Sequence, residues 1–459
     1  MMQTDLIIIG AGPGGYRAAE LAAKGGLQVV IVERSHLGGT CLNEGCIPTK
    51  CYARNAEALM LVNEASTFGI NISSIPTFCL SQARERKEEV VKQLREGIGT
   101  LLSHPAITIM EGDARFIDSH TVTIEADKPE IVTAPNIIIA TGSVPKRLPI
   151  KLSDDCQVLD SSDLLQLDSL PRRLCIIGAG VIGMEFASIF NAFGTEVTVV
   201  EYLRECLPQL DSDIAKRLRK ALERRGVKFC MQSSVTAIER HGDEKLINFT
   251  DKKGRQLIIQ ADEVLMAVGR VPRITGDLQE VGIDCDTRAG IHVDGNLQTN
   301  VPGVYAIGDV NGLQMLAHAA EAQACQVVAH ILSNAEAKGK RDIPAAIFTF
   351  PEAACVGKSE DRLKEEGKPY ECRKAFHRAN GKALAMAEAE GMLKLLSEPH
   401  AGRIVGCHAY GAHAADMVQE VSVLMEMQVT VRQLREMIHI HPTISEIIVS
   451  AAEQTNSAQ

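Results

Sequence analysis

Short apolar runs separated by glycine-rich turns and amphipathic segments dominate the hydrophobic pattern of this chain. The run Leu6–Ile9 precedes a glycine-rich segment at 10–15, a helical apolar spacing follows over 16–23, and a second apolar run, Val29–Val32, ends at Glu33. Apolar runs of about four to eight residues flanked by glycine are typical of buried strands, and an intervening helix makes a crossover. The segment is therefore predicted to form a strand–turn–helix–strand unit.

The same order of elements recurs 168 residues later. Leu174–Ile177 leads into a glycine-rich segment at 178–183, and Val197–Val200 ends at Glu201. In both copies the acidic residue lies 23 residues after the first glycine of its segment. Such glycines let the backbone approach a pyrophosphate that rests on the helix N-terminus, and the acid accepts hydrogen bonds from a ribose. One copy alone is a weak signal, but two copies in register predict two dinucleotide-binding sites.

Apolar patterns outside the repeats predict the remaining elements. Helical spacing continues to about residue 63, and a second helix is predicted over 81–102, where mixed charges indicate a solvated face. From about residue 341 the pattern changes to α+β. The other predicted segments are strands around 114–125 and 136–140, a proline-containing linker at 144–150, a strand meander at 228–259, a strand at 304–307, and helices near 412–427 and 431–437.

Composition and charge exclude several classes of protein. The 459 residues are 45% hydrophobic and 23% charged, which is ordinary for a globular chain of two to four domains. A formal net charge of −10 without any basic stretch argues against non-specific binding to nucleic acid. No apolar run approaches the roughly 18–20 residues that span a bilayer, and the start does not resemble a signal peptide. We therefore expect a cytoplasmic protein, in which a disulfide is more often catalytic than structural.

Cys41 and Cys46 are the main candidates for chemistry. They are two of 13 cysteines, and no second pair at a related spacing completes a zinc site, so no metal is expected. A regular helix would hold their Cα atoms roughly 8–9 Å apart, whereas a disulfide needs less than about 7 Å. We therefore expect Cys41 in an irregular turn that Gly38, Gly39 and Gly45 allow, and Cys46 at a helix N-terminus, where a thiolate is stabilised. This favours a redox couple over two small buried hydrophobic residues.

Two dinucleotide sites beside a dithiol predict one flavin and one nicotinamide cofactor, the natural pair for hydride transfer. The site nearer the cysteines should hold FAD. Glu201 would repel a 2′-phosphate, so NAD is predicted over NADP, although Arg204 near the same strand end could accommodate that phosphate. The strand ending in Gly308-Asp309 suits a ribityl hydroxyl, which implies that the chain returns to the first nucleotide domain.

His441 and Glu446 form a candidate acid–base pair. Pro442 biases His441 away from helical geometry, and Glu446 is expected in the first turns of the following helix. A carboxylate fixes the imidazole tautomer and raises its basicity, and dithiol oxidation requires a base because the thiolate attacks. Spacing alone favours a surface histidine, but the paired cysteines favour a base. His439 faces the other way, and we assign it a packing or supporting role.

Together, these motifs resemble the pyridine nucleotide–disulfide oxidoreductases. The resemblance covers essentially the whole chain, and within the family the segment Cys46–Lys50 looks most like the branch that oxidises dihydrolipoamide. It rests on the segments 10–16, 38–50, 140–142, 178–185, 308–309, 348–352 and 441–446. The family implies a homodimer in which His441 and Glu446 complete the active site of the other subunit.

The fold expected from this resemblance is α/β, with two Rossmann-like dinucleotide-binding domains, for FAD and NAD, and a C-terminal α+β dimerisation domain. We expect residues 1–146 to form the first part of the FAD-binding domain and 147–271 to form an inserted NAD-binding domain. Residues 272–340 would be a central segment returning to the FAD domain, and 341–459 the C-terminal dimerisation domain.

The resemblance also implies roles for single residues. Cys41 would be the outer thiol that exchanges with dihydrolipoamide, and Cys46 the inner thiol in charge-transfer contact with the flavin. Lys50 and Glu185 would pair near the reactive nitrogen of the flavin. The expected FAD-binding residues are Gly10, Gly12, Gly14, Gly15, Glu33, Gly39, Thr40, Thr141, Gly142, Gly308, Asp309, Leu316, Ala317 and His318, and the expected NAD-binding residues are Gly178, Gly180, Gly183, Glu201 and Gly269.

The chain departs from the family pattern at two places. Gln323-Ala324 stands where the family often has Glu-Gly, which puts local helix packing in doubt. Cys51, directly after Lys50, is a third thiol near the redox pair. It could be inert core or a site of oxidation, and the sequence leaves both interpretations open.

The function implied is oxidation of protein-bound dihydrolipoamide through a Cys41–Cys46 disulfide and FAD, with hydride transfer to NAD+. The partner implied is the lipoyl-bearing core protein of a 2-oxo acid dehydrogenase complex or a glycine cleavage system. A glutathione reductase would favour arginine-rich NADP recognition over Glu201, and a mercuric reductase would carry a further cysteine pair, which 451–459 lacks. A non-catalytic, flavin-loaded docking subunit would require none of the intact Cys41, Cys46, His441 and Glu446.

Overall fold

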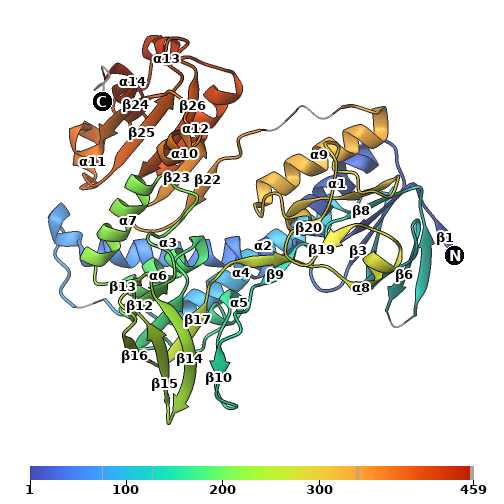
Figure 1. Ribbon diagram of the computed structural model, residues 1–459, viewed down its shortest axis with the longest axis horizontal. Coiled ribbons are helices and arrows are strands. Elements are labelled where there is room, and N and C mark those ends of the chain that lie inside the picture. Colours follow the sequence, from blue (N-terminus) through green and yellow to red (C-terminus); the bar gives the residue numbers. More distant parts are fainter. Residues whose placement is uncertain (75, 127, 337–338, 340, 455–459) are drawn as a thin grey trace.

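The first glycine motif lies at the carboxyl edge of a five-stranded parallel sheet, ordered β21-β8-β2-β3-β4 (Figure 1). The structure is a computed structural model that describes residues 1–74, 76–126, 128–336, 339 and 341–454. Strand residues alternate between the two faces of the sheet. Leu6 and Ile8 pack toward helices α1 and α9, while Ile7 and Ile9 pack toward a smaller sheet, β1-β7-β6-β5. The elements of this unit are β1 Met2–Gln3, β2 Leu6–Ile9, α1 Pro13–Lys24, β3 Val29–Glu33, β4 Ile107–Glu111, β5 Asp113–Asp118, β6 Thr121–Glu125, β7 Glu130–Thr133, β8 Asn136–Ile139, β21 Val304–Ala306, η2 Gly308–Asn311 and α9 Ala317–Ser333.

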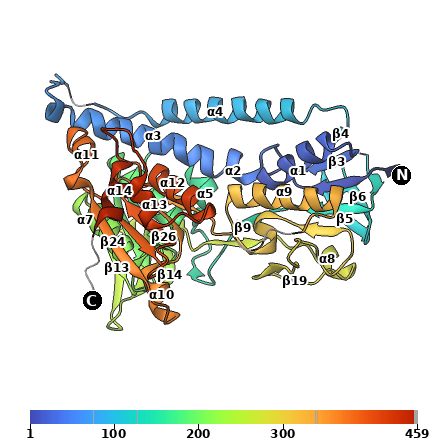
Figure 2. The ribbon, with the colours of Figure 1, turned by 90° about the horizontal axis from the view of Figure 1, so that it is seen from above.

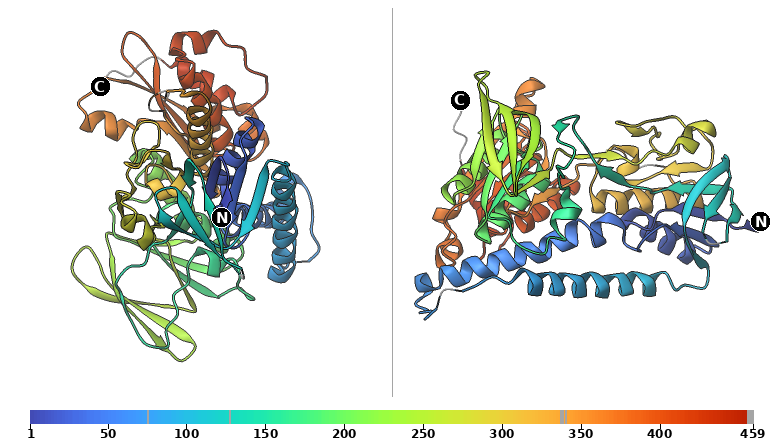
Figure 3. Two further views of the ribbon diagram at one scale, coloured as in Figure 1. Left: turned by 90° about the vertical axis from the view of Figure 1, so that its right-hand side faces the viewer. Right: turned by 90° about the horizontal axis from the view of Figure 1, so that it is seen from below.

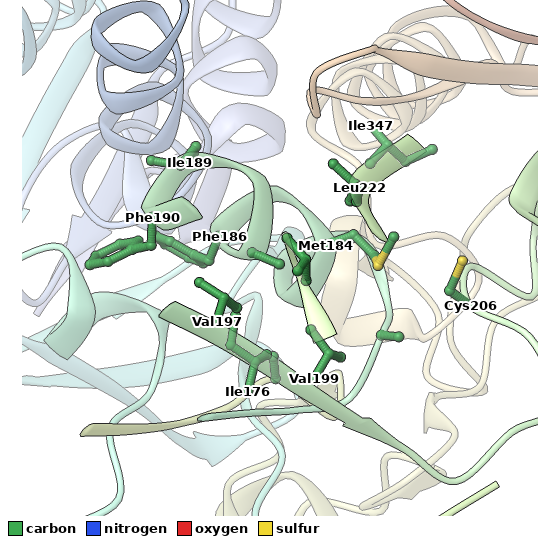
Figure 4. Packing of buried hydrophobic residues seen from close by; sticks show 14 of the residues in the cluster. Ile176, Met184, Phe186, Ile189, Phe190, Val197, Val199, Cys206, Leu222 and Ile347 are labelled. Carbon is green, nitrogen blue, oxygen red and sulfur yellow. The ribbon is translucent and has the colours of Figure 1, made fainter. Parts of the chain in front are cut away.

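The second glycine motif lies at the same edge of a four-stranded parallel sheet, ordered β13-β12-β11-β17. Helix α6 covers one face of this sheet with Met184, Phe186 and Phe190, which pack on Ile176 and Val197 (Figure 4). A mixed sheet, β10-β14-β15-β16, in which only β10 pairs in parallel, lies beside it. The elements are β10 Lys151–Leu152, α5 Ser161–Leu164, β11 Arg173–Ile177, α6 Val181–Ala192, β12 Glu196–Glu201, α7 Ser212–Arg224, β13 Lys228–Met231, β14 Ser234–His241, β15 Glu244–Thr250, β16 Gln256–Ala261 and β17 Glu263–Met266.

Two short antiparallel strands connect the nucleotide units. Strand β9, Ser143–Pro145, pairs with β18, Arg270–Pro272, and β21 then returns to the first sheet beside β8. The remaining elements of this connection are α8 Gly276–Glu280, β19 Cys285–Asp286 and β20 Gly290–Ile291. The second unit is thus inserted between strands of the first.

The C-terminal unit is a five-stranded antiparallel sheet, ordered β22-β23-β26-β25-β24, packed against helices α12 to α14. Its strand residues Leu393, Leu395 and Cys407 are fully buried in the core that the sheet forms with these helices. The elements are β22 Ala345–Ile347, β23 Ala353–Gly357, α10 Glu360–Glu365, β24 Glu371–Phe376, η3 His377–Ala379, α11 Gly381–Ala385, β25 Met392–Ser397, β26 Ile404–Tyr410, α12 Ala414–Glu426, α13 Val431–Glu436 and α14 Glu446–Glu453.

A buried ion-pair network joins this C-terminal sheet to the second nucleotide unit. Lys394 Nζ lies 2.5 Å from Asp211 Oδ1 and 2.8 Å from Glu360 Oε2, and both Lys394 and Asp211 are 1% exposed. Removing one partner of such a pair leaves an uncompensated buried charge. The network therefore holds α7 in a defined place against the C-terminal sheet.

A long helical pair runs along one side of the molecule, where α4, Leu80–Leu101, lies beside α3, Cys46–Asn63 (Figures 2 and 3). A short helix α2, Gly39–Asn43, precedes α3, and a 3₁₀ turn η1, Ala65–Phe68, follows it. Among the residues that the structure describes, no helix is both long and apolar enough to cross a membrane.

The predicted α/β fold class is confirmed, and four finer expectations need revision. The charged face of α4 is not wholly solvated, because Lys87 is 2% exposed and donates to the Leu165 carbonyl at 3.0 Å. The linker at 144–150 includes strand β9, and the meander at 228–259 begins with a strand of the parallel sheet. Cys41 lies in helix α2, not in an irregular turn. The four domain boundaries remain a prediction, and residues 455–459 of the last one lie outside the described residues.

Candidate redox site

A cavity of about 1680 Å³ joins the two glycine motifs and the cysteine segment. Its walls include residues from all three units of the chain, and most of the residues expected to bind a cofactor lie on it. The cavity-lining members of that set are Gly10, Gly12, Gly14, Glu33, Gly39, Thr40, Thr141, Gly142, Gly308, Asp309, Leu316, Ala317, His318, Gly178, Gly180, Glu201 and Gly269. Gly15 and Gly183 are absent from the wall.

Gly15 and Gly183 allow close packing of each helix against its strand end. A Cβ atom at Gly15 would lie 1.8 Å from the Gly10 carbonyl oxygen, and one at Gly183 would lie 2.0 Å from that of Gly178. Both distances are far below any van der Waals contact, so only glycine lets the helix approach the strand end this closely. Direct contact of these two glycines with a cofactor remains a prediction.

The N-termini of α1 and α6 fit the phosphates of dinucleotides. Their N-caps, Gly12 and Gly180, lie on the cavity wall, offer no side-chain cap, and are followed by no acidic residue in the first turn. The free N–H groups and the helix dipole of each therefore face an anion in the cavity. The residues present fit both FAD and NAD.

Glu33 and Glu201 occupy equivalent positions in the two units. Glu33 accepts from the backbone N–H groups of Ala11 at 2.8 Å and Ser35 at 3.0 Å, and Glu201 accepts from those of Ala179 at 2.6 Å and Leu203 at 2.7 Å. Two backbone donors fix each carboxylate in orientation at the strand end, and a fixed negative charge there disfavours a 2′-phosphate.

Arg204 is the residue near this strand end that could bind the 2′-phosphate of NADP. It does not line the main cavity but a separate surface groove with Lys216 and Lys252, while Tyr202 and Leu203 line the cavity. The observed placement thus favours NAD at the second site.

The cysteine segment is held against the first glycine turn by close backbone contact. Gly39, at φ +61°, lies so close to Gly12 that a Cβ atom on Gly39 would be 2.7 Å from the Gly12 Cα. Helix α2 carries Cys41 and ends at Asn43, and α3 begins at Cys46 after Gly45. The break between two helices brings the two thiols together, which no continuous helix would do.

Both thiols are free in this structure, and each shifts the pKa of the other. Hydrogen bonding from Cys41 and the positive charge of Lys50 lower the pKa of Cys46 to about 7. Hydrogen bonding to Cys46 and burial raise the pKa of Cys41. Cys46 is therefore the sulfur that carries a thiolate near neutral pH, in agreement with its place at a helix N-terminus.

Lys50 and Glu185 form an ion pair on the cavity wall. Lys50 Nζ lies 3.0 Å from Oε1 and 2.9 Å from Oε2 of Glu185, which is 4% exposed. The pair connects α3 of the first unit to α6 of the second. It places an ammonium group one helical turn from Cys46.

Asp309 takes part in a chain of hydrogen bonds across the connecting strands. Its Oδ2 accepts from Ser143 Oγ at 2.5 Å, and Arg270 donates to Ser143 Oγ at 2.7 Å and to the Ser143 carbonyl at 2.8 Å. Gln323, one of the departures from the family pattern, accepts from Gly308 N–H at 2.7 Å. It thus supports the turn that presents Asp309, a role that the sequence did not reveal.

His441 and Glu446 form the expected pair, but outside the cavity wall. His441 Nδ1 lies 2.9 Å from Glu446 Oε1, and Glu446 Oε2 accepts from Thr443 N–H at 2.9 Å. These two contacts lower the pKa of Glu446. The His441 side chain is 80% exposed, and neither residue lines the cavity that holds the cysteines.

His439 supports the same segment. Its Nε2 lies 2.7 Å from Glu420 Oε1 on α12, and its side chain is 11% exposed. This is the supporting position that the alternation of His439 and His441 predicted.

Two residues near the site, Arg95 and Phe348, were given no role from the sequence, and the structure also decides between the two interpretations of Cys51. Arg95 of α4 donates to the Asn43 side chain at 2.7 and 3.1 Å and so supports the cysteine segment. Phe348 donates its N–H to Glu185 Oε1 at 3.0 Å. Cys51 is buried, and burial raises the pKa of its thiol, which favours an inert core residue over a site of oxidation.

Comparison with known proteins agrees with this geometry. Residues 4–324 match the family described as pyridine nucleotide-disulphide oxidoreductase, and residues 343–452 match the dimerisation domain of that family. A dihydrolipoyl dehydrogenase of Chlamydia muridarum (strain MoPn / Nigg) is 36% identical over 98% of this chain and 96% of that protein. A dihydrolipoyl dehydrogenase of Bacillus subtilis (strain 168) is 36% identical over 98% of each.

A solved structure gives a second comparison. The HOCl-induced flavoprotein disulfide reductase RclA from Escherichia coli superposes with a TM-score of 0.87 at 28% identity, over 98% of this chain and 99% of that chain.

Proposed function

This chain belongs to the pyridine nucleotide–disulfide oxidoreductases, and from that premise we propose that it is a dihydrolipoyl dehydrogenase that oxidises protein-bound dihydrolipoamide with NAD+. The cofactors of this family are FAD and a nicotinamide dinucleotide. The observation that carries the proposal is the cavity that the cysteine segment shares with both glycine motifs. Full-length identity of 36% to proteins named dihydrolipoyl dehydrogenase supports the same substrate.

The chemistry begins with Cys41 and Cys46 as a disulfide. His441 removes a proton from dihydrolipoamide, and the resulting thiolate attacks Cys41 Sγ, which forms a mixed disulfide and releases Cys46 as a thiolate. The second substrate thiol then displaces Cys41, so lipoamide leaves with its own disulfide and the enzyme holds two reduced sulfurs. The substrate loses two electrons and two protons. FAD, which the first glycine motif and Asp309 would hold, would supply a two-electron carrier between the dithiol and an NAD+ held at the second glycine motif.

The chain's own residues give each step a physical basis. The lowered pKa of Cys46 makes it the better leaving group when Cys41 is attacked. The Lys50 ammonium stabilises negative charge that develops nearby in the cavity. Glu446 holds the imidazole of His441 in one orientation and stabilises its protonated form.

The active site is proposed to form between two subunits. His441 is highly exposed on the C-terminal unit, and that unit matches the family's dimerisation domain. In a symmetric dimer, His441 and Glu446 of one copy would face Cys41 of the other. The proposed partner is the lipoyl-bearing core of a 2-oxo acid dehydrogenase or glycine cleavage system, and the proposed location is the cytoplasm.

Anaerobic titration of the purified protein with dihydrolipoamide tests the function. We expect a long-wavelength absorbance shoulder near two-electron reduction, which disappears as NADH forms after NAD+ is added. No reduction by dihydrolipoamide, beside clean reduction by NADH, would contradict the proposal. That outcome would favour a reductase of another disulfide, the alternative that the likeness to RclA supports.

A further inference from the structure

Three segments far apart in the sequence meet at the Lys50–Glu185 pair. Besides its two contacts with Lys50, Glu185 Oε1 accepts from the N–H of Phe348 at 3.0 Å. The Phe348 ring also faces the same ammonium, with Lys50 Nζ 4.7 Å from the ring centroid. Phe348 thus contacts both members of the ion pair, one through its backbone and one through its ring.

The backbone of Phe348 is held firmly against α6. A second hydrogen bond lies next to the Phe348–Glu185 contact: Phe350 donates its N–H to Ser188 Oγ at 2.9 Å. Phe350 follows Phe348 by two residues, and Ser188 follows Glu185 by three residues on α6. Strand β22 ends at Ile347, which is fully buried in the core. The ring of Phe348 therefore has a defined position and direction.

The ring of Phe348 is not part of the core. Its neighbours Ile347 and Phe350 pack in the large core around α6, whereas Phe348 belongs to none of the hydrophobic clusters that the described residues form and lines the cavity instead. Core filling therefore does not account for an aromatic residue here. A cation–π contact with Lys50 does account for an aromatic residue at this position. The ring quadrupole attracts the ammonium group, and the attraction is stronger where water is partly excluded.

We propose that Phe348 is a positioning residue for Lys50: its N–H orients Glu185, and its ring holds the ammonium toward the redox cysteines. Without the ring, Lys50 keeps its ion pair but gains freedom to move into the cavity, since its side chain is 32% exposed. The positive charge of Lys50 is one of the causes of the lowered pKa of Cys46. A less fixed Lys50 therefore leaves the Cys46 thiolate less stable. This inference rests on the proposed redox role of the dithiol.

The test replaces Phe348 by Leu, which keeps the N–H and the apolar volume but removes the aromatic face. In the two-electron-reduced holoenzyme, the long-wavelength absorbance and the rate of Cys46 alkylation are followed against pH. We expect the midpoint to rise by about half a pH unit and kcat to fall about two- to tenfold with KM unchanged. Phe348→Tyr, which keeps the face, should behave as wild type.

Two further variants separate positioning from a structural effect. In a Lys50→Met background, Phe348→Leu should cause no additional change, because the ring acts through the ammonium. Phe376→Leu is a matched control, since its ring lies 4.8 Å from the Arg378 guanidinium and does not line the cavity, and the midpoint should not move. If Phe348→Leu does not bind flavin, Phe348→Met is measured in its place.

An unchanged midpoint and kcat in Phe348→Leu would overturn the inference, and so would an equal change in the Lys50→Met background. The reduced state is prepared with NADH, so the alkylation and absorbance measurements do not depend on the disulfide substrate. A wild-type enzyme inactive toward dihydrolipoamide would contradict the proposed function and leave this test intact.

Discussion

Two carboxylate–nitrogen contacts of equal length, one to a lysine and one to a histidine, mark the two regions that are proposed to carry the chemistry. Lys50–Glu185 and His441–Glu446 both have a closest N···O distance of 2.9 Å. Glu185 is buried and is contacted from two other segments of the chain, whereas His441 is 80% exposed and its partner lies five residues away. The first pair is completed by the tertiary fold, and the second is a local motif that faces solvent.

This difference indicates how the site is divided. A buried pair is fixed by its surroundings, while an exposed pair contributes little until another surface covers it. The cysteine region is therefore complete within one chain. The His441 region is complete only in local structure, and its function depends on what packs against the C-terminal unit.

The largest effect is expected at the cysteine region. Cys41→Ser should lower NADH formation from dihydrolipoamide at least about 1000-fold, because it removes the sulfur that the substrate attacks. NADH-driven reduction of an artificial dye needs no dithiol and serves as the control, which should keep most of its rate. Substantial dihydrolipoamide turnover in this variant would contradict the mechanism.

Removal of the base is expected to have the next largest effect. His441→Gln should lower kcat about 100- to 1000-fold, within the usual range for a positioned general base. The two regions are proposed to meet across the dimer. Refolding a mixture of the Cys41→Ser and His441→Gln variant proteins should therefore restore about a quarter of wild-type activity. Half of randomly formed dimers would hold one intact site. No recovery would mean that the two regions act within one subunit or not together.

The pH dependence of Cys46 sharpens the description of the buried region. Its pKa of about 7 lies below the ordinary value of 9.0, so thiolate absorbance of the reduced enzyme should rise through about pH 7. A lowered pKa contributes stability that is fully present above about pH 9 and is lost as the pH falls through about 7. Lys50→Met should shift the midpoint upward by about one unit. An unchanged midpoint would show that Lys50 does not stabilise the thiolate.

The smallest effects are expected at the carboxylates around the histidines. Glu446→Gln should lower kcat about tenfold because the protonated imidazole loses its ionic partner. The lowered pKa of Glu446 keeps its carboxylate charged throughout the neutral range, so protonation of Glu446 itself should not contribute to the pH dependence of kcat there. Glu420→Gln, at the His439 pair, is the matched control and should change kcat less than about threefold. Equal effects at both positions would remove the distinction between His441 and His439.

Much of the fold follows from short-range sequence pattern. The two strand–turn–helix–strand units, the acids Glu33 and Glu201 at their ends, and the start of α3 at Cys46 were all predictable. Each of these features depends on residues that are close together in the sequence, within one turn or one strand–helix–strand crossover. Over such short distances the local geometry of the chain sets where each residue lies. The His441–Glu446 contact is predictable for the same reason.

The sequence by itself determined which residues could do chemistry here: a dithiol, two dinucleotide units and a histidine–carboxylate pair. Only the tertiary structure decided that Lys87 is buried, that Gly15 packs a helix instead of lining the cavity, and that Phe348 contacts Lys50. The physical reason is that spacing sets contacts only between near neighbours. A contact such as Phe348 with Lys50 joins residues about 300 positions apart, and it forms only once all three units have packed together.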